Sequence, residues 1–267
     1  MLCLFLAAIE VVSFNIRYDN PADGPNGWIH RQQTVSSYLT QSRADFIGLQ
    51  EVLPSQLAEL KPKLSDYKLI SRTREADEDH GESAPLLFHQ KRWRIDNAHQ
   101  GTMWLSTQPD KPGSKSWDSS LPRICTWGRF ERTGNGEPKA VWVMNTHFDH
   151  RGKTARLKSA RLIRQKIEQR PKEMAHEPVI VLGDLNTLPG SPPILTLGMA
   201  DALRDSASGT WNGWDAENRT GQRIDFILSR ELEVISGAVD FVTTDKGRPA
   251  SDHWPIRAVL RTPRRPF

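Results

Sequence analysis

The stretch Val179-Ile-Val-Leu-Gly-Asp-Leu-Asn186 decides how the rest of the chain is interpreted. Four apolar residues with high β propensity are followed at once by a glycine, a carboxylate and an amide. A short apolar run that is closed by turn-forming residues is typical of a buried strand. Its polar end is expected at the edge of a sheet, where such scaffolds commonly present functional side chains.

The same pattern of apolar runs recurs along the chain, which predicts a protein whose scaffold is made of β-sheets. Further apolar runs predict strands at residues 9–16, 44–49, 84–88, 140–144, 224–228 and 254–260. Sheets need helices to cover them, and helices are predicted at residues 31–41, in the segment after Pro54, and at residues 154–170. Long loops rich in turn formers separate these elements at residues 19–26, 72–82, 107–122 and 205–222.

Composition describes an ordinary globular protein. The 267 residues carry 36 basic and 32 acidic side chains, a formal charge of +4, with 37% hydrophobic and 25% charged residues. This balance excludes a strongly basic histone-like binder and an acidic tail protein. No repeat or linker divides the chain, so a single domain over residues 9–262 is expected. A monomer is favoured, although the oligomeric state stays open.

The start of the chain leaves two interpretations open. Residues 1–8 are apolar and form either an N-terminal extension or the remnant of a signal, so both a cytoplasmic and an exported protein are compatible with the sequence. No segment approaches the roughly 18 apolar residues of a membrane-spanning helix, so no stable membrane insertion is expected. Two cysteines, Cys3 and Cys125, do not indicate a disulfide framework.

Five short clusters share one pattern, an apolar strand that ends in residues able to bind a metal or transfer a proton. A single Asp or His at a strand end is more often a turn or cap residue, but five such ends in one chain are harder to assign to turns. The clusters are Ser13-Phe-Asn15, Leu49-Gln-Glu51, Met144-Asn-Thr-His147, Leu182-Gly-Asp-Leu-Asn186 and Ser251-Asp-His253.

The donor types of these clusters indicate a hard cation. Carboxylate and amide oxygens without a thiolate favour Mg²⁺, with Mn²⁺ as the alternative, and a histidine beside a carboxylate suits acid–base work. Such a site is suited to phosphoester hydrolysis. A zinc pair formed by His147 and His150 is the competing interpretation, weakened because no third histidine or cysteine stands at a convincing spacing.

In their order along the chain, these residues resemble the endonuclease/exonuclease/phosphatase superfamily, which includes DNase I, neutral sphingomyelinases, inositol-polyphosphate 5-phosphatases and nocturnin-type deadenylases. The resemblance is collinear from about residue 9 to residue 260 and is nearest to short bacterial members grouped loosely with the nocturnin-type branch. It implies an α/β (α+β) fold of DNase I type, a four-layer α/β/β/α sandwich of two packed mixed β-sheets. Its motifs are Ser-Phe-Asn-Ile-Arg at 13–17, Gln50-Glu51, Asn145-Thr-His147, Gly183-Asp-Leu-Asn186, Arg223-Ile-Asp225 and Ser251-Asp-His253.

The resemblance also implies roles for the residues that bind the metal and the attacking water. Glu51 would be the principal Mg²⁺ ligand, with Asn15 beside it, also facing the substrate, and Asp252 as a further ligand. Asp184 and Asn186 would orient the water and hold the scissile phosphate.

A second group is implied on the side of the phosphate and the leaving oxygen. His253, oriented by Asp225, would contact the phosphate or act as the base. His147 would help the leaving oxygen depart, with Glu82 supporting it. Arg123 would offer a bidentate contact to the phosphate.

The leading hypothesis is therefore a Mg²⁺-dependent phosphoesterase that cleaves phosphodiester bonds, a nuclease of endonuclease or 3′–5′ exonuclease type. Arg17 stands where abasic-site endonucleases place an aspartate, which argues against base-excision repair. Trp211 and Trp214 are expected to wall the pocket and contact a nucleic acid or nucleotide, whereas Trp93, Trp104 and Trp142 are expected in the core.

Other functions remain open at this point. They are a phosphomonoesterase acting on nucleotides or sugar phosphates, a sphingomyelinase-like phospholipid phosphodiesterase, and a catalytically silent domain that binds anions. The silent domain is the least favoured, because no ligand or base of the motifs is lost.

Overall fold

The apolar runs form the inner strands of two six-stranded sheets that pack face to face. The computed structural model describes residues 8–263. The β1 sheet has the strand order β11-β12-β1-β2-β4-β3, and the β8 sheet has the order β5-β6-β7-β8-β10-β9. The pairs β1–β2 and β7–β8 are parallel and the other pairs are antiparallel.

The elements have the following bounds. The β1 sheet contains β1 (Ile9–Asn15), β2 (Phe46–Gln50), β3 (Tyr67–Ile70), β4 (Leu86–His89), β11 (Glu233–Val239) and β12 (Ile256–Arg261). The β8 sheet contains β5 (Trp93–Trp104), β6 (Ile124–Arg132), β7 (Ala140–His147), β8 (Val179–Asp184), β9 (Ala200–Asp201) and β10 (Asp225–Arg230). The helices are α1 (Gln32–Ser42), α2 (Pro54–Leu60), α3 (Lys153–Glu168) and α4 (Pro192–Leu197), with short 3₁₀ turns at Pro21–Asn26, Trp28–His30, Lys61–Leu64 and Lys172–Met174.

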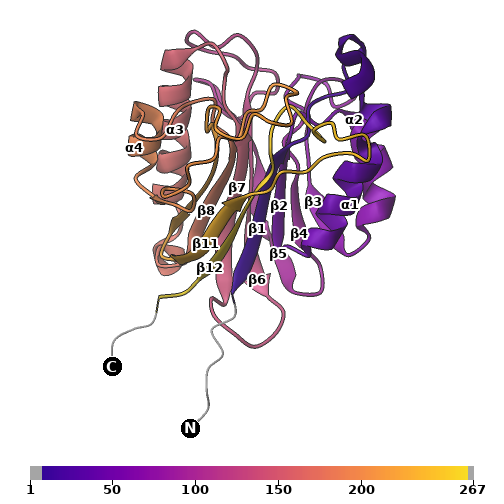
Figure 1. Cartoon of the computed structure of the whole chain (residues 1–267). Helices are drawn as coiled ribbons and strands as arrows, with labels where there is room; N and C mark the ends of the chain where they lie inside the picture. The colour runs from indigo at the N-terminus through magenta and orange to yellow at the C-terminus, as the bar shows by residue number, and fades with distance from the viewer. Residues whose placement is uncertain (1–7, 264–267) are drawn as a thin grey trace.

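Helices cover the outer faces of both sheets, so the four-layer α/β/β/α sandwich is confirmed (Figure 1). Residues such as Val11 and Leu182 pack between the sheets. The outer face of β1 and β2 packs against α1, and the outer face of β7 and β8 packs against α3 and α4. Each sheet is thus buried on both faces at its centre, which is why the central strands are nearly continuous apolar runs.

The sequence patterns missed strands that lie mainly at sheet edges. β3, β5, β9 and β11 are edge strands, and their side chains are mostly partly or fully exposed. An edge strand with solvent on one face does not need an apolar run, so periodicity does not reveal it. The three predicted helices form, within one or two residues of their expected starts, whereas α4 was not anticipated.

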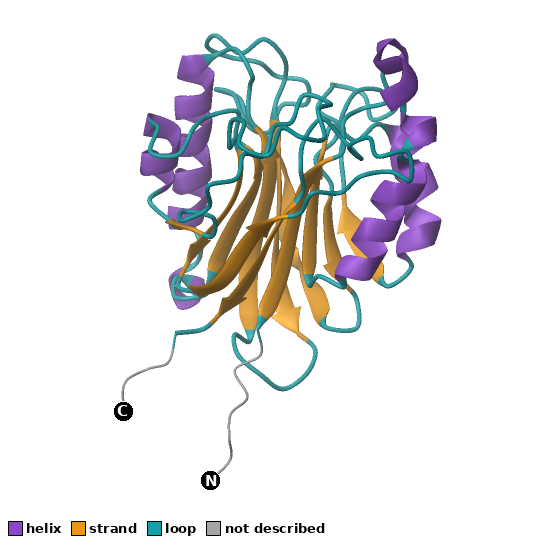
Figure 2. Cartoon of the chain, viewed as in Figure 1, coloured by secondary structure: helices purple, strands orange, loops and turns teal. Residues whose placement is uncertain are grey.

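The fold brings the five clusters to one end of the molecule. The carboxyl ends of β1, β2, β7 and β8 carry four of them, and the fifth lies just before β12, which runs antiparallel to β1. Loops gather at this end, opposite the start of β1 and the end of β12 (Figure 1 and Figure 2).

Gly183 is required by the close approach of β8 to β7. Its φ is +140°, and a Cβ there would lie 1.8 Å from the carbonyl oxygen of Thr146. We expect Gly183→Ala to lower the free energy of unfolding by about 3 kcal/mol or more, because backbone must move to accommodate the methyl group. Chemical denaturation measures this. Gly190→Ala is the control, since Gly190 also has positive φ but no atom within 4 Å of its Cβ position. Equal losses in the two variants would contradict the steric explanation.

Candidate active site

Three adjacent strands place His147, Asp184 and Asp225 in one row. In the sheet register His147 is paired with Asp184 across β7–β8, and Asp225 with Asp184 across β8–β10. Asp184 is only 1% exposed, and its Oδ2 lies 3.4 Å from His147 Nε2. Asn186 follows in the chain, and its Nδ2 lies 3.0 Å from the same His147 nitrogen. The Gly-Asp-Leu-Asn cluster therefore meets the histidine of β7 directly.

His253 forms a buried pair with Asp225. Its Nδ1 lies 2.9 Å from Asp225 Oδ2, which leaves Nε2 directed towards Asp184, 3.8 Å from Oδ2. Burial by itself would lower the pKa of His253, but the carboxylates of Asp225 and Asp184 outweigh burial and hold that pKa well above its usual range. This imidazole is the cationic one of the site.

His147 differs from His253 in protonation. Burial, reinforced by the positive charges of Arg123 and Arg74, holds the pKa of His147 well below its usual range. Burial also raises the pKa of Asp184 to about 7, and repulsion from Asp225 contributes in the same direction. The site therefore combines a cationic imidazole, a neutral imidazole and a carboxyl group that titrates near neutrality, the set that acid–base chemistry requires.

A second acidic group lies beside this row. Asn15 Nδ2 donates to Glu51 Oε1 at 3.0 Å and to Asp184 Oδ2 at 3.1 Å, so the amide links the two groups. Asp252 lies on the other side of Arg17, whose Nη1 is 3.9 Å from Glu51 Oε2 and 3.8 Å from Asp252 Oδ2. Burial, followed by repulsion from Glu51, raises the pKa of Asp252.

Several residues around this acidic group have left-handed backbone conformations. Arg17, Glu51, Asn186 and Trp214 have φ values of 56°, 61°, 47° and 72°. Such conformations cost of order 1 kcal/mol or more for residues other than glycine and persist where the surroundings hold them. The backbone is therefore constrained at Glu51, in the acidic group, and at three residues around it.

The residues present fit a divalent cation. Glu51, Asp252 and Asp184 offer carboxylate oxygens, the hard donors that Mg²⁺ and Mn²⁺ prefer. Asn15 lies among them, with its amide nitrogen on Glu51 and Asp184 and its amide oxygen accepting from Arg17 N. Burying these carboxylates side by side is unfavourable without positive charge, as the raised pKa values of Asp184 and Asp252 show. Donor atoms of Asp184, Asp225 and His253 also lie within 4.8 Å of one another.

A cavity of about 540 Å³ opens over these groups. Of the predicted residues, it is lined by Glu51, Glu82, Arg123, His147, Asp184, Asn186, Trp211, Asp252 and His253. Asn15 and Asp225 lie beneath it, bonded to Glu51 and His253. The structure therefore brings the predicted site residues together at one place.

The cavity wall also contains residues to which the sequence patterns gave no role in the site: Arg17, Tyr18, Arg74 and Leu121. His150, which was considered only as a zinc partner of His147, lies there too. Arg74 Nη1 donates to Glu82 Oε2 at 2.7 Å, so the bond found for Glu82 is to an arginine rather than to the expected partner His147. The only available signals were the position of Arg74 in a long predicted loop and that of Arg17 in the Ser-Phe-Asn-Ile-Arg motif.

Arg123 is an unusual cation in this wall. It is 5% exposed, its Nη2 lies 3.1 Å from His150 Nδ1, and its Nε is 3.7 Å from Asp149 Oδ2. That carboxylate oxygen already accepts bonds from Ser120 and Leu121. Within residues 8–263, the Nε of Arg123 has no hydrogen-bond partner. Because Arg123 also lines the cavity, its guanidinium is suited to contact an anionic ligand there.

Four of the five tryptophans with a predicted location lie where they were expected. Trp211 lines the cavity and is 42% exposed, whereas Trp93, Trp104 and Trp142 are buried. Trp214 was expected beside Trp211, but this expectation is wrong. Its ring instead stacks on the guanidinium of Arg31, 5.4 Å away, and it is not among the cavity residues.

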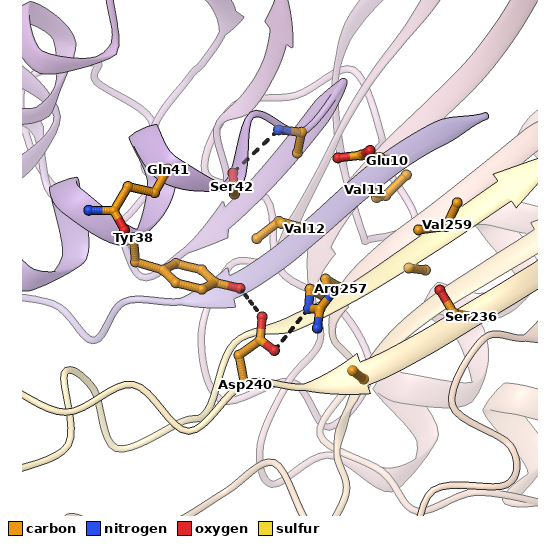
Figure 3. Close-up of a pocket in the computed structure, with 13 residues that line it drawn as sticks. Glu10, Val11, Val12, Tyr38, Gln41, Ser42, Ser236, Asp240, Arg257 and Val259 are labelled. Carbon is orange, nitrogen blue, oxygen red and sulfur yellow. Dashed lines mark hydrogen bonds and ion pairs between the residues drawn. The ribbon is translucent and has the colours of Figure 1, made fainter. Parts of the chain in front are cut away.

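Another cavity, of about 570 Å³, lies against α1 and the β11–β12–β1 side of the β1 sheet (Figure 3). Its main polar groups bond to one another: Tyr38 Oη donates to Asp240 Oδ2 at 2.9 Å, and Arg257 Nε donates to Asp240 Oδ1 at 2.9 Å. It contains none of the residues of the five clusters, so it is not the candidate active site. Among the described residues, no helix has the length and apolar character needed to cross a membrane.

Comparison with known proteins agrees with this geometry. A family model described as the Endonuclease/Exonuclease/phosphatase family matches residues 12–253. The structure resembles that of a protein of this family from Bacteroides vulgatus, with 31% identity, a TM-score of 0.87 and coverage of 96% of this chain and 100% of the other. A family protein from Bacteroides thetaiotaomicron has 29% identity and a TM-score of 0.87 over 97% of this chain and 99% of the other.

A third similar structure is a mannosyl-6-phosphatase from Bacteroides thetaiotaomicron. It has 29% identity and a TM-score of 0.85, and the match covers 94% of this chain and 99% of the other. No curated protein sequence matches the chain.

Proposed function

The chain belongs to the endonuclease/exonuclease/phosphatase family, whose members are hydrolases acting on phosphoester bonds. On this premise we propose that it is a divalent-metal-dependent phosphomonoesterase, and that its substrate is a small phosphorylated sugar or similar alcohol. The observation that carries the proposal is the arrangement of Asp184, His253 and Arg123 around one cavity, which combines acid–base groups with a buried guanidinium that has an unpartnered N–H. It rests also on the 29% identity to a sugar phosphatase over nearly the whole chain.

Glu51, Asn15 and Asp252 would hold Mg²⁺ or Mn²⁺. The alternative group of Asp184, Asp225 and His253 is less suitable, because Asp225 and His253 are already bonded to each other. When bound, the cation supplies positive charge to the phosphoryl oxygens and lowers the cost of their developing negative charge.

The other residues act on protons and on the phosphate. Asp184 is suited to accept the proton of the attacking water, since its pKa is about 7, and Asn186 to orient that water. The new bond joins the water oxygen to phosphorus as the ester P–O bond breaks. His253, held cationic by Asp225, lines the same cavity and would donate a proton to the leaving oxygen as the ester bond breaks. The alternative assignment of the leaving oxygen to His147 stays a prediction from the family resemblance.

Charge favours a monoester over a diester. A phosphomonoester carries a charge of about −1.5 to −2 near neutral pH, whereas a diester carries one negative charge. Arg17 is hydrogen-bonded to Asp23 and Arg74 to Glu82, whereas the Nε of Arg123 lies 3.7 Å from its carboxylate neighbour Asp149, so Arg123 is the arginine of this wall best suited to balance the second charge. A single well-exposed tryptophan, Trp211, suits one sugar or base ring rather than a stacked strand.

A nuclease remains the second candidate because of a basic cavity beside the site. This cavity, of about 440 Å³, is lined by Lys153 and Arg156 and by Thr187, the residue after Asn186. Positive side chains next to a catalytic centre are able to track a phosphate backbone. This basic cavity therefore supports the phosphodiester specificity that was predicted from the sequence, as the second candidate.

Variants of Arg123 and Lys153 distinguish the two candidates. We expect Arg123→Met to raise KM for sugar phosphates and p-nitrophenyl phosphate by roughly 10-fold or more, because a charged hydrogen bond to the phosphate is lost. Lys153→Met should leave these values unchanged. The assay is steady-state kinetics with Mg²⁺ or Mn²⁺ against monoesters, bis-p-nitrophenyl phosphate, and single-stranded RNA and DNA. Cleavage confined to polynucleotides, with Lys153→Met the more damaged variant, would establish the nuclease instead.

A further inference from the structure

Arg31 is a fully buried arginine that contacts main-chain carbonyls. It is 1% exposed, and its guanidinium stands over the rings of Trp28 and Trp214, 5.1 and 5.4 Å away. Its nitrogens donate to the carbonyl oxygens of Ile16, Arg17 (2.7 Å), Tyr18 (3.4 Å), Asn26 (2.9 Å) and Ala250 (3.3 Å). A planar guanidinium with five N–H donors is the side chain able to satisfy carbonyls from several segments at once.

Four of these carbonyls, all except that of Asn26, belong to two of the three segments that carry the proposed metal ligands, those of Asn15 and Asp252. Ile16 follows Asn15 at the end of β1, and Ala250 precedes Ser251 and Asp252. The segments also touch directly, because Ser251 Oγ donates to the carbonyl oxygen of Asn15 at 2.7 Å. Arg31 therefore crosses from one side of the acidic group to the other behind its ligands.

Trp214 extends this contact to the cavity rim. Its segment is bonded to the Asp252 backbone, because Asn212 N and Gly213 N donate to the Asp252 carbonyl at 2.9 and 3.1 Å. Trp211, in the same segment, forms a β-bridge with His253. Arg31 thus contacts the end of β1, the Ala250 carbonyl and, through the Trp214 ring, the segment that is bonded to the Asp252 backbone.

Charge and geometry make opposite predictions for Arg31. Its positive charge lies close enough to Asp252 and Glu51 to interact with both, so by charge alone it repels a cation bound there. Burial lowers the pKa of Arg31 to about 10, which still leaves it charged at neutral pH. If its main effect were electrostatic, removing the charge would tighten metal binding. If its main effect is to hold the two segments, losing the guanidinium would weaken metal binding.

We propose that Arg31 is a positioning residue that holds the end of β1 at a set distance from the Asp252 segment, and so organises the divalent-cation site before the cation binds. The inference rests on the proposed function, since it requires the metal site at Glu51, Asn15 and Asp252. Arg31 touches neither the cation nor the substrate and acts through the backbone of the residues that do.

The chain provides a matched control in Arg170. Its nitrogens donate to the carbonyl oxygens of Ile167, Ala175 and Glu177 at 2.8 to 3.1 Å, and its guanidinium stands 5.7 Å from the Trp142 ring. It follows α3 and lies near the start of β8, whereas Asp184 is at the end of that strand. The two arginines make the same kind of contact, but Arg31 lies at the carboxyl end of β1 and Arg170 near the amino end of β8, in the other sheet.

The test is calorimetric titration of Mg²⁺ and Mn²⁺ into the full chain and its Arg31→Lys, Arg31→Met, Arg170→Lys and Arg170→Met variants, with thermal melts of the metal-free proteins. Both pairs should melt at lower temperature. Only the Arg31 variants should bind metal more weakly, by about 10-fold or more, and Arg31→Lys should not rescue affinity although it keeps the charge.

Tighter binding by Arg31→Met, or unchanged affinity in Arg31→Lys, would overturn the proposal. If the Arg31 variants fail to fold, Trp214→Leu takes their place, because it removes a ring that holds the guanidinium; unchanged affinity there would equally overturn it. A wild-type protein that binds neither cation would instead overturn the proposed function, and the positioning role with it.

Discussion

Replacing Asp184 by asparagine is expected to lower kcat for a phosphomonoester by about 10³-fold while leaving the fold intact. Asparagine keeps the shape of the side chain and its bond from Asn186 N, but it cannot accept the proton of the attacking water. It also removes a negative charge that raises the pKa of His253, so the pKa of this imidazole should fall. Steady-state kinetics in saturating Mg²⁺ measure the loss, and circular dichroism checks the fold.

Asp45→Asn is the matched control for this variant. Asp45 is equally buried and accepts bonds from Glu10 N and from Trp93 Nε1, but it precedes β2, whose far end carries Glu51. It should cost stability and leave kcat within a few-fold of the wild type. Wild-type turnover by Asp184→Asn would refute the role of Asp184, and a comparable loss in Asp45→Asn would indicate a general effect of altering a buried aspartate.

Removing the metal is expected to abolish activity, and Glu51→Gln to reduce metal affinity by about 100-fold. Excess chelator should stop hydrolysis completely, and Mg²⁺ or Mn²⁺ should restore it. Glutamine has nearly the same size and shape as the glutamate at the end of β2, but it lacks the negative charge that attracts a hard cation. Metal titrations followed by calorimetry and by activity give the affinity and the dependence of rate on metal.

Glu177→Gln serves as the control for Glu51, because Glu177 pairs with Arg129 away from the cavity. Full activity in excess chelator would sink the metal-dependent mechanism. Restoration by Zn²⁺ but not by Mg²⁺ or Mn²⁺ would instead favour a zinc pair of His147 and His150.

The central strands were predictable because they are buried on both faces. Val179–Asp184 has no exposed residue, so its apolar run had to appear in the sequence. Glu233–Val239 and Trp93–Trp104 lie at sheet edges, and their half-exposed side chains leave no such pattern. Their strand state comes from pairing with a neighbour far away in the chain, which no local window contains.

The site was predictable to the extent that each residue stood at a strand end. Asp184 and His147 follow apolar runs, and the register of two parallel strands then sets them side by side. Arg74 and Arg31 had no such signal. One reaches the cavity from a long loop, and the other lies behind the ligands and bonds only to carbonyls, so residue type and spacing reveal neither.

Residue types and their order are enough to predict the fold class and the chemical character of the site, because buried strands need apolar side chains and a hard cation needs carboxylates. The protonation state and orientation of each group depend on the packed structure. The two histidines have the same intrinsic chemistry, yet one is held cationic by Asp225 and the other neutral by burial near Arg123. Likewise Trp214 packs on Arg31 while Trp211 faces the cavity. Protonation and orientation depend on neighbours that are not adjacent in the chain, such as Asp225 for His253 and Arg31 for Trp214, and those neighbours come together only when the two sheets pack.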